Sequence, residues 1–189
     1  YAGELVRADI GISLPGPQAS YAFLSGREET AALLPPRRRN THKGTYGKAA
    51  IVAGSEVYTG AAALATMAAL RSGCGYTALF LPRDILPHYL LKFPEALIAP
   101  ISDGGRVAFT EKNFEKLLSF DSIAFGMGTG ISEDVFSAVQ FLLREYTGRL
   151  ILDADALNSL AKYGKGRMGE IFEEKKCDVL LTPHVREFS

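Results

Sequence analysis

The sequence has no excess charge of either sign, only two cysteines and no long apolar run. Its 21 basic and 21 acidic residues cancel to a formal net charge of zero, so no overall field favours nucleic acid or an anionic membrane as a partner. Cys74 and Cys177 form neither a CxxC pair nor a metal-ligand pattern, which suits a reducing compartment. No stretch approaches the roughly 18 consecutive apolar residues of a membrane span, and no signal-type segment is present. These absences predict a cytoplasmic protein that binds neither nucleic acid nor membrane.

What the sequence does have is a regular alternation of short apolar runs and amphipathic segments from about residue 49 onward. Such alternation is typical of a βαβ series, which forms a mostly parallel sheet with helices on both faces. It predicts strands at 49–54, 76–81, 96–99, 122–125, 149–153 and 178–182, and helices at 60–72, 84–92, 111–118, 132–144 and 155–162.

Residues 1–35 do not share this alternation, because prolines and glycines interrupt them. They are predicted to be a leader or connector, with a short helix within 22–34 that ends before the proline pair. The length of 189 residues is enough for one domain or slightly more.

Small and glycine-rich loops follow two of the predicted strands. An open parallel sheet binds its ligand at the carboxyl ends of its strands, so these loops are candidate site segments. Gly60, Ala61 and Ala62 open an alanine-rich helix whose free amides could attract an anion; the alternative is that Thr59 merely caps this helix.

The second of these loops contains Gly126, Gly128 and Gly130, whose alternate spacing predicts a tight turn with exposed amides suited to a phosphate. The spacing lacks the last glycine of GxGxxG, and the chain contains no Walker GxxxxGK[ST] motif. This loop alone is therefore a weak signal.

Carboxylates and a histidine follow the last two predicted strands. Asp153 and Asp155, with Asn158 further on, could hold a metal-bound phosphate or orient a hydroxyl; equally, Asp155 could cap a helix and Asp153 could be a hydrogen-bonded strand end. His184, with Glu187 three residues later, could hydrogen-bond a substrate hydroxyl or amide. A lone histidine is more often structural, and no second histidine close in sequence supports a zinc site.

Lys43 and Gly44 precede the first predicted strand. The lysine could neutralise a phosphate and the glycine permits a tight turn, or the segment could simply be a solvated loop.

Taken in order, six segments resemble the NAD(P)H-hydrate dehydratases, the family of the YjeF C-terminal domain. They are HKGTYG at 42–47, YTGAA at 58–62, ALRSGCGY at 69–76, GMGTG at 126–130, DADALN at 153–158 and LTPH at 181–184. The resemblance implies a three-layer αβα, ribokinase-like fold over residues 30–189, incomplete at its C-terminal end.

The resemblance also implies a reaction and a set of site residues. Such enzymes use ADP or ATP, with Mg²⁺ expected, to phosphorylate hydrated NADH or NADPH; loss of phosphate then restores NAD(P)H. The residues implied to bind the hydrated cofactor are Gly60, Ala61, Ala62, Gly126, Gly128, Gly130, Asp153, Asp155, Asn158 and His184. Those implied to bind the nucleotide or its phosphates are Lys43, Gly44 and Glu187. No side chains are implied as metal ligands.

Two departures from the family pattern bear on activity. Arg186 stands where the family usually has a glycine before Glu187. The later glycine-rich segment that ends in the catalytic aspartate is not found in this sequence, so we expect that aspartate beyond Ser189 and expect this chain alone to be inactive.

Residues 6–12 resemble the closing strand of an NAD(P)H-hydrate epimerase domain. We therefore expect residues 1–29 to be the end of a fused epimerase domain. An incomplete sheet would expose apolar surface, which predicts a homo-oligomer. Two other functions stay open: a vitamin-precursor or sugar kinase of the same fold, and a nucleotide-binding module without catalysis.

Overall fold

A computed structural model describes residues 26–34 and 36–188, which belong to two compact units that divide after Arg39. The first unit contains helix α1 (Arg27–Leu33). At its start, the Glu29 carboxylate accepts a hydrogen bond from the Gly26 amide at 3.0 Å, which satisfies one of the free donors of the helix.

The helix predicted within 22–34 is confirmed over the residues of α1, and residues 22–25 lie outside the described residues. The expected boundary between residues 29 and 30 falls inside α1, whereas the two units divide after Arg39. The assignment of residues 1–29 to an epimerase domain stays a prediction.

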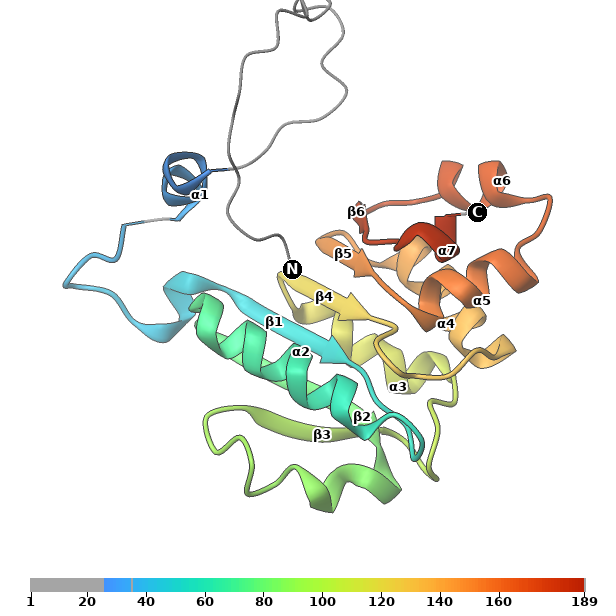
Figure 1. The fold of residues 1–189 in the computed structure, drawn as a ribbon, viewed down its shortest axis with the longest axis horizontal. Helices are drawn as coiled ribbons and strands as arrows, with labels where there is room; N and C mark the ends of the chain where they lie inside the picture. Colours follow the sequence, from blue (N-terminus) through green and yellow to red (C-terminus); the bar gives the residue numbers. More distant parts are fainter. Residues whose placement is uncertain (1–25, 35, 189) are drawn as a thin grey trace, which may run out of the picture. The chain divides into compact units, whose positions relative to one another are not determined.

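The second unit is built on one sheet of six parallel strands in the order β3-β2-β1-β4-β5-β6 (Figure 1). The fold class predicted from the sequence is thereby confirmed. The strands are β1 (Lys48–Val52), β2 (Tyr76–Pro82), β3 (Leu97–Ser102), β4 (Ser122–Phe125), β5 (Arg149–Leu152) and β6 (Asp178–Leu181).

Two strand boundaries differ from the prediction by more than one residue, for identifiable reasons. The strand predicted to reach residue 54 ends at Val52, because Gly54 has a φ of +85°, which an extended strand does not allow. The strand predicted to end at 99 continues through Pro100 to Ser102, which is possible because β3 lies at the edge of the sheet.

Helices connect the strands and follow the predicted order with several differences. The α-helices of this unit are α2 (Thr59–Ser72), α3 (Glu111–Glu115), α4 (Glu133–Glu145), α5 (Asp155–Tyr163), α6 (Met168–Glu173) and α7 (Val185–Phe188). The 3₁₀ segments are η2 (Lys43–Tyr46), η3 (Arg83–His88) and η4 (Lys116–Ser119).

Two of the helix predictions need correction, and two short helices were missed. The α-helix predicted at 84–92 is the 3₁₀ segment η3, because Pro87 has no amide to donate and disfavours helical backbone before it. The helix predicted at 111–118 is divided between α3 and η4. The short helices α6 and α7 were not predicted, since they are too short to show a helical period.

Apolar clusters cover both faces of the sheet. Successive side chains of β1 point to opposite faces, so Ile51 packs in one cluster and Val52 in the other. On the Ile51 side, α2 runs along β1 and β2 (Figure 1). On the Val52 side, α4 buries Val135 and Val139 completely. Burial of each such side chain contributes about 1.5–3 kcal/mol to the stability of the fold. With helices packed on both faces of the sheet, the unit has the predicted three layers.

The chain order creates a switch point in the sheet. From β1 the chain proceeds to β2 and β3 on one side, and then returns to place β4 on the other side of β1. The loops that leave β1 and β4 therefore diverge at the carboxyl edge, which is where open parallel sheets bind their ligands.

No helix within residues 26–34 and 36–188 is long and apolar enough to cross a bilayer.

Candidate functional site

The loop after β4 is pressed against the loop after β5. Gly126 has a φ of +120°, and a Cβ atom there would lie 2.6 Å from the Ala156 Cβ and would overlap the Asp153 carbonyl oxygen. The Asp155 amide donates to the Gly126 carbonyl at 3.2 Å. Only glycine permits both this backbone conformation and this approach, so the predicted tight turn is present and joins two candidate segments.

Gly128 joins the same loop to the start of α2. Its φ is +73°, and a Cβ atom there would lie 2.7 Å from the Tyr58 Cβ and 2.9 Å from the Ala61 Cβ. The Gly54 amide donates to the Met127 carbonyl at 2.9 Å and ties the β1 loop to the β4 loop. The YTGAA segment at 58–62 and the GMGTG segment at 126–130 are therefore in direct contact at one edge of the sheet.

The start of α2 is not capped by Thr59, which was the alternative interpretation of this segment. The residue that precedes the first helical turn is Tyr58, with no side-chain cap, so Thr59 does not cap the helix. The Thr59 carbonyl accepts a hydrogen bond from the Tyr89 hydroxyl, and burial raises the pKa of that hydroxyl. This contact fixes the turn that holds Gly60 and Ala61.

Of the three small residues predicted in this turn, two are accessible. Gly60 is exposed and Ala61 is partly covered by Gly128. Ala62 is fully buried in the apolar cluster under α2, next to Gly54. Its side chain therefore supports the turn from below and does not face a ligand.

Asp155 holds the glycine loop in place. Its Oδ2 atom accepts a hydrogen bond from the Gly130 amide at 2.8 Å. The residue that precedes α5 is Ala154, with a φ of +48° that is costly for a residue with a side chain. Asp155 is the first residue of α5 and not its cap, so the capping alternative for Asp155 is wrong and its carboxylate is occupied by the loop.

Asp153 lies between the β4 and β5 loops with a different role. Its amide donates to the Phe125 carbonyl at 3.1 Å, as expected of a strand end. Its carboxylate is half-buried, and no hydrogen bond is recorded for it among the described residues. Asn158, also half-buried, lies on the next turn of α5, where its amide donates to the Ala154 carbonyl. The Asp153 carboxylate is therefore available to a ligand.

His184 and Glu187 form a local pair after β6. The Nδ1 atom of His184 accepts from the Arg186 and Glu187 amides at 3.1 and 3.3 Å, so a neutral ring carries its proton on Nε2. The Glu187 carboxylate accepts from the His184 amide at 3.0 Å and lies 3.3 Å from His184 Nε2. Arg186, where the family usually has glycine, is part of the short helix α7. A carboxylate so engaged orients the histidine, and its charge opposes the phosphate contact predicted for Glu187.

Lys43 and Gly44 do not join these residues. They belong to η2, which precedes β1 and so lies at the amino edge of the sheet, opposite the loops described above. The Lys43 ammonium lies 4.5 Å from the centre of the Tyr76 ring, and Gly75 packs directly on the Lys43 carbonyl. The HKGTYG segment therefore braces the starts of β1 and β2.

A cleft of about 390 Å³ lies beside the glycine loop and was not predicted. We call it the outer cleft. Its walls come from the loops after β1, β3 and β4, including Glu56, Arg106, Val107, Gly130, Ile131 and Ser132. In the sequence, the Asp-Gly-Gly-Arg segment at 103–106 follows a predicted strand, and this position could have indicated that it borders a ligand site.

The described residues offer no protein-only metal site. Among residues 26–34 and 36–188, no group of three or more His, Cys, Asp or Glu side chains could hold a metal ion. Asp155 is engaged with Gly130, which leaves Asp153 as the carboxylate of the DADALN segment without a recorded bond. A hard cation at this edge would need oxygen ligands from a bound phosphate as well.

Comparison with known proteins gives one matching family model, described as NAD(P)H-hydrate dehydratase, over residues 49–189. A bifunctional NAD(P)H-hydrate repair enzyme from Dictyoglomus turgidum is 35% identical over 197 aligned positions, which cover 100% of this chain and 37% of that protein. An ADP-dependent (S)-NAD(P)H-hydrate dehydratase from Streptococcus thermophilus is 31% identical, with coverage of 82% of this chain and 52% of that one.

A solved structure extends the similarity to three dimensions. The ADP/ATP-dependent NAD(P)H-hydrate dehydratase from Bacillus subtilis, co-crystallized with ATP and Mg²⁺, matches with a TM-score of 0.66 and 32% identity. The match covers 85% of this chain and 52% of that one. The chain thus spans about half the length of these dehydratases and just over a third of the bifunctional relative.

Proposed function

The chain belongs to the NAD(P)H-hydrate dehydratase family, and on this premise we propose that its protein repairs hydrated NADH and NADPH at the expense of ADP or ATP. One observation carries the proposal beyond family membership. Loops that follow β1, β4 and β5, far apart in sequence, meet at the carboxyl edge around the β1/β4 switch point. They bring together the small residues and the Asp153 carboxylate, and His184 follows the neighbouring strand β6 at the same edge.

The proposed reaction has two steps. The hydroxyl oxygen of the hydrated nicotinamide forms a bond to the terminal phosphorus, the bond to the leaving nucleotide breaks, and the hydroxyl proton passes to a base. The phosphate then leaves with its C–O bonding pair while the neighbouring carbon loses a proton, which restores the ring double bond. Phosphoryl transfer of this kind depends mainly on positioning and on stabilisation of charge.

The described residues contribute positioning to these steps. The half-buried Asp153 carboxylate can accept a hydrogen bond from a substrate hydroxyl. The Glu187 carboxylate and two backbone amides fix both nitrogens of the exposed His184 ring, so its ring face can pack on the substrate, and Nε2 can hydrogen-bond the substrate when it leaves Glu187. Gly60 and Ala61 leave room for the ring to approach the backbone.

The general base and the nucleotide-binding residues are proposed for the whole protein and not for the 189 residues of this chain. The resemblance implies a catalytic aspartate beyond Ser189, and the matched regions cover about half of the dehydratases from Streptococcus thermophilus and Bacillus subtilis. Mg²⁺ is proposed to bind with the nucleotide phosphates, which supply the oxygen ligands it prefers. Lys43 and Gly44 lie at the opposite sheet edge, so they are not part of this reaction centre.

We also propose that the whole protein carries a fused epimerase domain and acts in the cytoplasm as a homo-oligomer. The alignment with the bifunctional relative from Dictyoglomus turgidum includes 100% of this chain, and so extends over residues 1–29. It supports the expectation that these residues are the end of such a domain.

The test is the absorbance of reduced nicotinamide after hydrated NADH is mixed with ADP or ATP and Mg²⁺. It uses the 189-residue chain and a protein extended beyond Ser189, with a mixture that lacks nucleotide as control. Recovery of absorbance with release of phosphate by the extended protein supports the proposal. A stable phosphorylated product without recovery would instead favour a small-molecule kinase of the same fold. Asp153→Asn in the extended protein is expected to lower the turnover rate because it removes the charge that orients the hydroxyl.

A further inference from the structure

The outer cleft adjoins the proposed reaction centre at Gly130 and extends away from it towards the loop after β3. The loop after β3 forms one wall and is anchored at both ends. The Glu56 amide donates to the Gly105 carbonyl at 2.8 Å, and the Ser102 hydroxyl donates to the Arg106 carbonyl at 2.8 Å. The anchored backbone presents the Arg106 side chain at a fixed place on the cleft wall.

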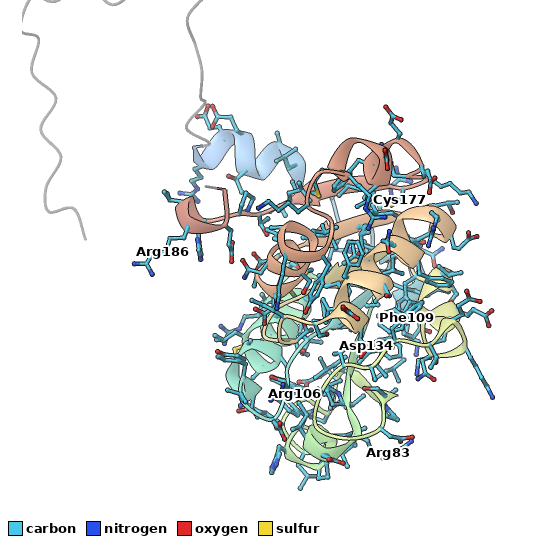
Figure 2. The ribbon with its side chains drawn as sticks, turned by 90° about the vertical axis from the view of Figure 1, so that its right-hand side faces the viewer. Arg83, Arg106, Phe109, Asp134, Cys177 and Arg186 are labelled. Carbon is cyan, nitrogen blue, oxygen red and sulfur yellow. The ribbon has the colours of Figure 1, made fainter. Side chains whose placement is uncertain are left out.

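A second anchor joins the far end of this loop to α4. The Phe109 amide donates to Asp134 Oδ1 at 3.0 Å, and the two residues lie beside each other in Figure 2. The Asp134 carboxylate is therefore committed to the loop. The volume of about 390 Å³ is within the range of roughly 300–1,000 Å³ that small-molecule sites occupy.

Glu56 and Arg106 form a pair of opposite charges on the cleft wall that a ligand can engage, whereas Asp103, which also lines the cleft, pairs with Arg83. Arg106 Nε lies 3.2 Å from Glu56 Oε1, and the two side chains are 71% and 55% exposed. An exposed pair of this kind contributes about 0–1 kcal/mol, so each group can turn to a ligand at little cost. A carboxylate accepts hydrogen bonds from vicinal ribose hydroxyls, and a guanidinium pairs with a phosphate through two hydrogen bonds.

The other wall is apolar. Val107 is buried behind it, and Ile131 is 48% exposed on the β4 side. A planar base can pack on such a surface while its sugar faces the charged pair. These features together match a nucleoside with free ribose hydroxyls or a ribose phosphate.

The position of the cleft indicates which nucleoside of a dinucleotide substrate it would bind. It lies on the β3 side of the glycine loop, whereas Asp153 and His184 follow β5 and β6 on the other side. The cleft extends from the β3 loop, five strand spacings or roughly 24 Å from β6, to the β4 loop, which is one strand spacing from β5 and two from β6. A dinucleotide joins two nucleosides through a pyrophosphate, so it requires two separate pockets of this kind.

We propose that the outer cleft binds the adenosine end of the hydrated dinucleotide and that Glu56 and Arg106 determine which form is accepted. Glu56 accepts hydrogen bonds from the ribose hydroxyls of hydrated NADH. Arg106 leaves Glu56 and pairs with the 2′-phosphate of hydrated NADPH. This inference rests on the proposed function, since it assigns the second half of that substrate.

The test compares KM for hydrated NADH and hydrated NADPH in the extended protein. Arg106→Ala is expected to raise KM for hydrated NADPH about tenfold or more, because a hydrogen-bonded charge contributes roughly 1.5–3 kcal/mol, and to change KM for hydrated NADH less than about twofold. Arg83→Ala is the matched control, since Arg83 pairs with Asp103 of the same loop at 2.6 Å but does not line the cleft.

A binding experiment on the 189-residue chain separates this inference from the proposed function. Calorimetry with adenosine 2′,5′-bisphosphate and with 5′-AMP is expected to show tighter binding of the bisphosphate, and Arg106→Ala is expected to remove the difference. Equal affinity of the two ligands for the unmodified chain, or equal effects of Arg106→Ala on both KM values, would overturn the inference. Absence of repair with either hydrated cofactor would contradict the proposed function, and the calorimetry would still decide the role of Arg106.

Discussion

The two glycines Gly128 and Gly130 provide a direct test of how the β4 loop is built. Both have left-handed backbone, with φ of +73° and +83°. They differ in their surroundings: a Cβ atom at Gly128 would lie 2.7 Å from the Tyr58 Cβ and 2.9 Å from the Ala61 Cβ, whereas at Gly130 no atom lies within 4 Å. The substitutions Gly128→Ala and Gly130→Ala therefore separate backbone strain from steric overlap.

The expected costs follow from these surroundings. Each alanine in left-handed backbone costs about 1–2 kcal/mol. At Gly128 the overlap involves two Cβ atoms fixed to backbone, so the first turn of α2 must shift, and overpacking adds about 1–3 kcal/mol. We expect Gly130→Ala to lower the free energy of unfolding by about 1–2 kcal/mol and Gly128→Ala to lower it by about 2–5 kcal/mol.

Urea denaturation of the chain and its two variants measures these differences, with the midpoint compared at equal m-values. In the extended protein, Gly128→Ala should also raise KM for the hydrated cofactor, because it displaces Ala61. Equal destabilisation by the two substitutions, or a larger effect at Gly130, would refute the contact between the β4 loop and α2.

Three further predictions follow from single contacts. Asp155→Ala should accelerate hydrogen exchange of the Gly130 amide and lower the free energy of unfolding by about 1–2 kcal/mol, whereas Asp155→Asn, which keeps an acceptor oxygen, should lose less; unchanged exchange in the alanine variant would contradict the hydrogen bond. Burial raises the pKa of Tyr146 to about 12, so the folded state holds this proton more tightly and the free energy of unfolding should fall between pH 10 and 12 by up to about 2–3 kcal/mol; Tyr146→Phe should remove this part of the pH dependence in denaturation curves. Burial raises the pKa of the Cys177 thiol, so a thiol reagent at neutral pH should modify the half-buried Cys74 well before Cys177 in mass spectra; the reverse order would contradict the packing.

The fold could be predicted from the sequence because its signals are local. Apolar runs of strand length alternate with amphipathic segments, and the predicted strand at 122–125 coincides with β4. The failures are also local in origin. Pro87 turns a segment with helical spacing into the 3₁₀ segment η3, and Gly54 ends β1 before its apolar run is over.

The candidate site could be predicted in part, because a parallel sheet places the loops that follow its strands at one edge. The same rule, applied to Lys43, would have placed it at the other edge, since it precedes β1. The outer cleft could not be predicted, because it depends on contacts between distant residues. Arg106 and Glu56 are 50 positions apart, and the hydrogen bond from the Glu56 amide to Gly105 has no local sequence signal.

Asp153 and Asp155 show why residue type alone did not assign the roles within the site. In the sequence they are equivalent carboxylates two positions apart, but the backbone at Ala154 has a φ of +48° and separates them. Asp155 accepts the Gly130 amide, so that donor is not free for a phosphate, and the charge of Asp155 opposes an anion at the same place. The glycine loop then serves mainly to let three loops approach one another. We therefore expect the Arg106 variant to be a more informative probe of phosphate recognition at this edge than a substitution that removes the Gly130 amide contact.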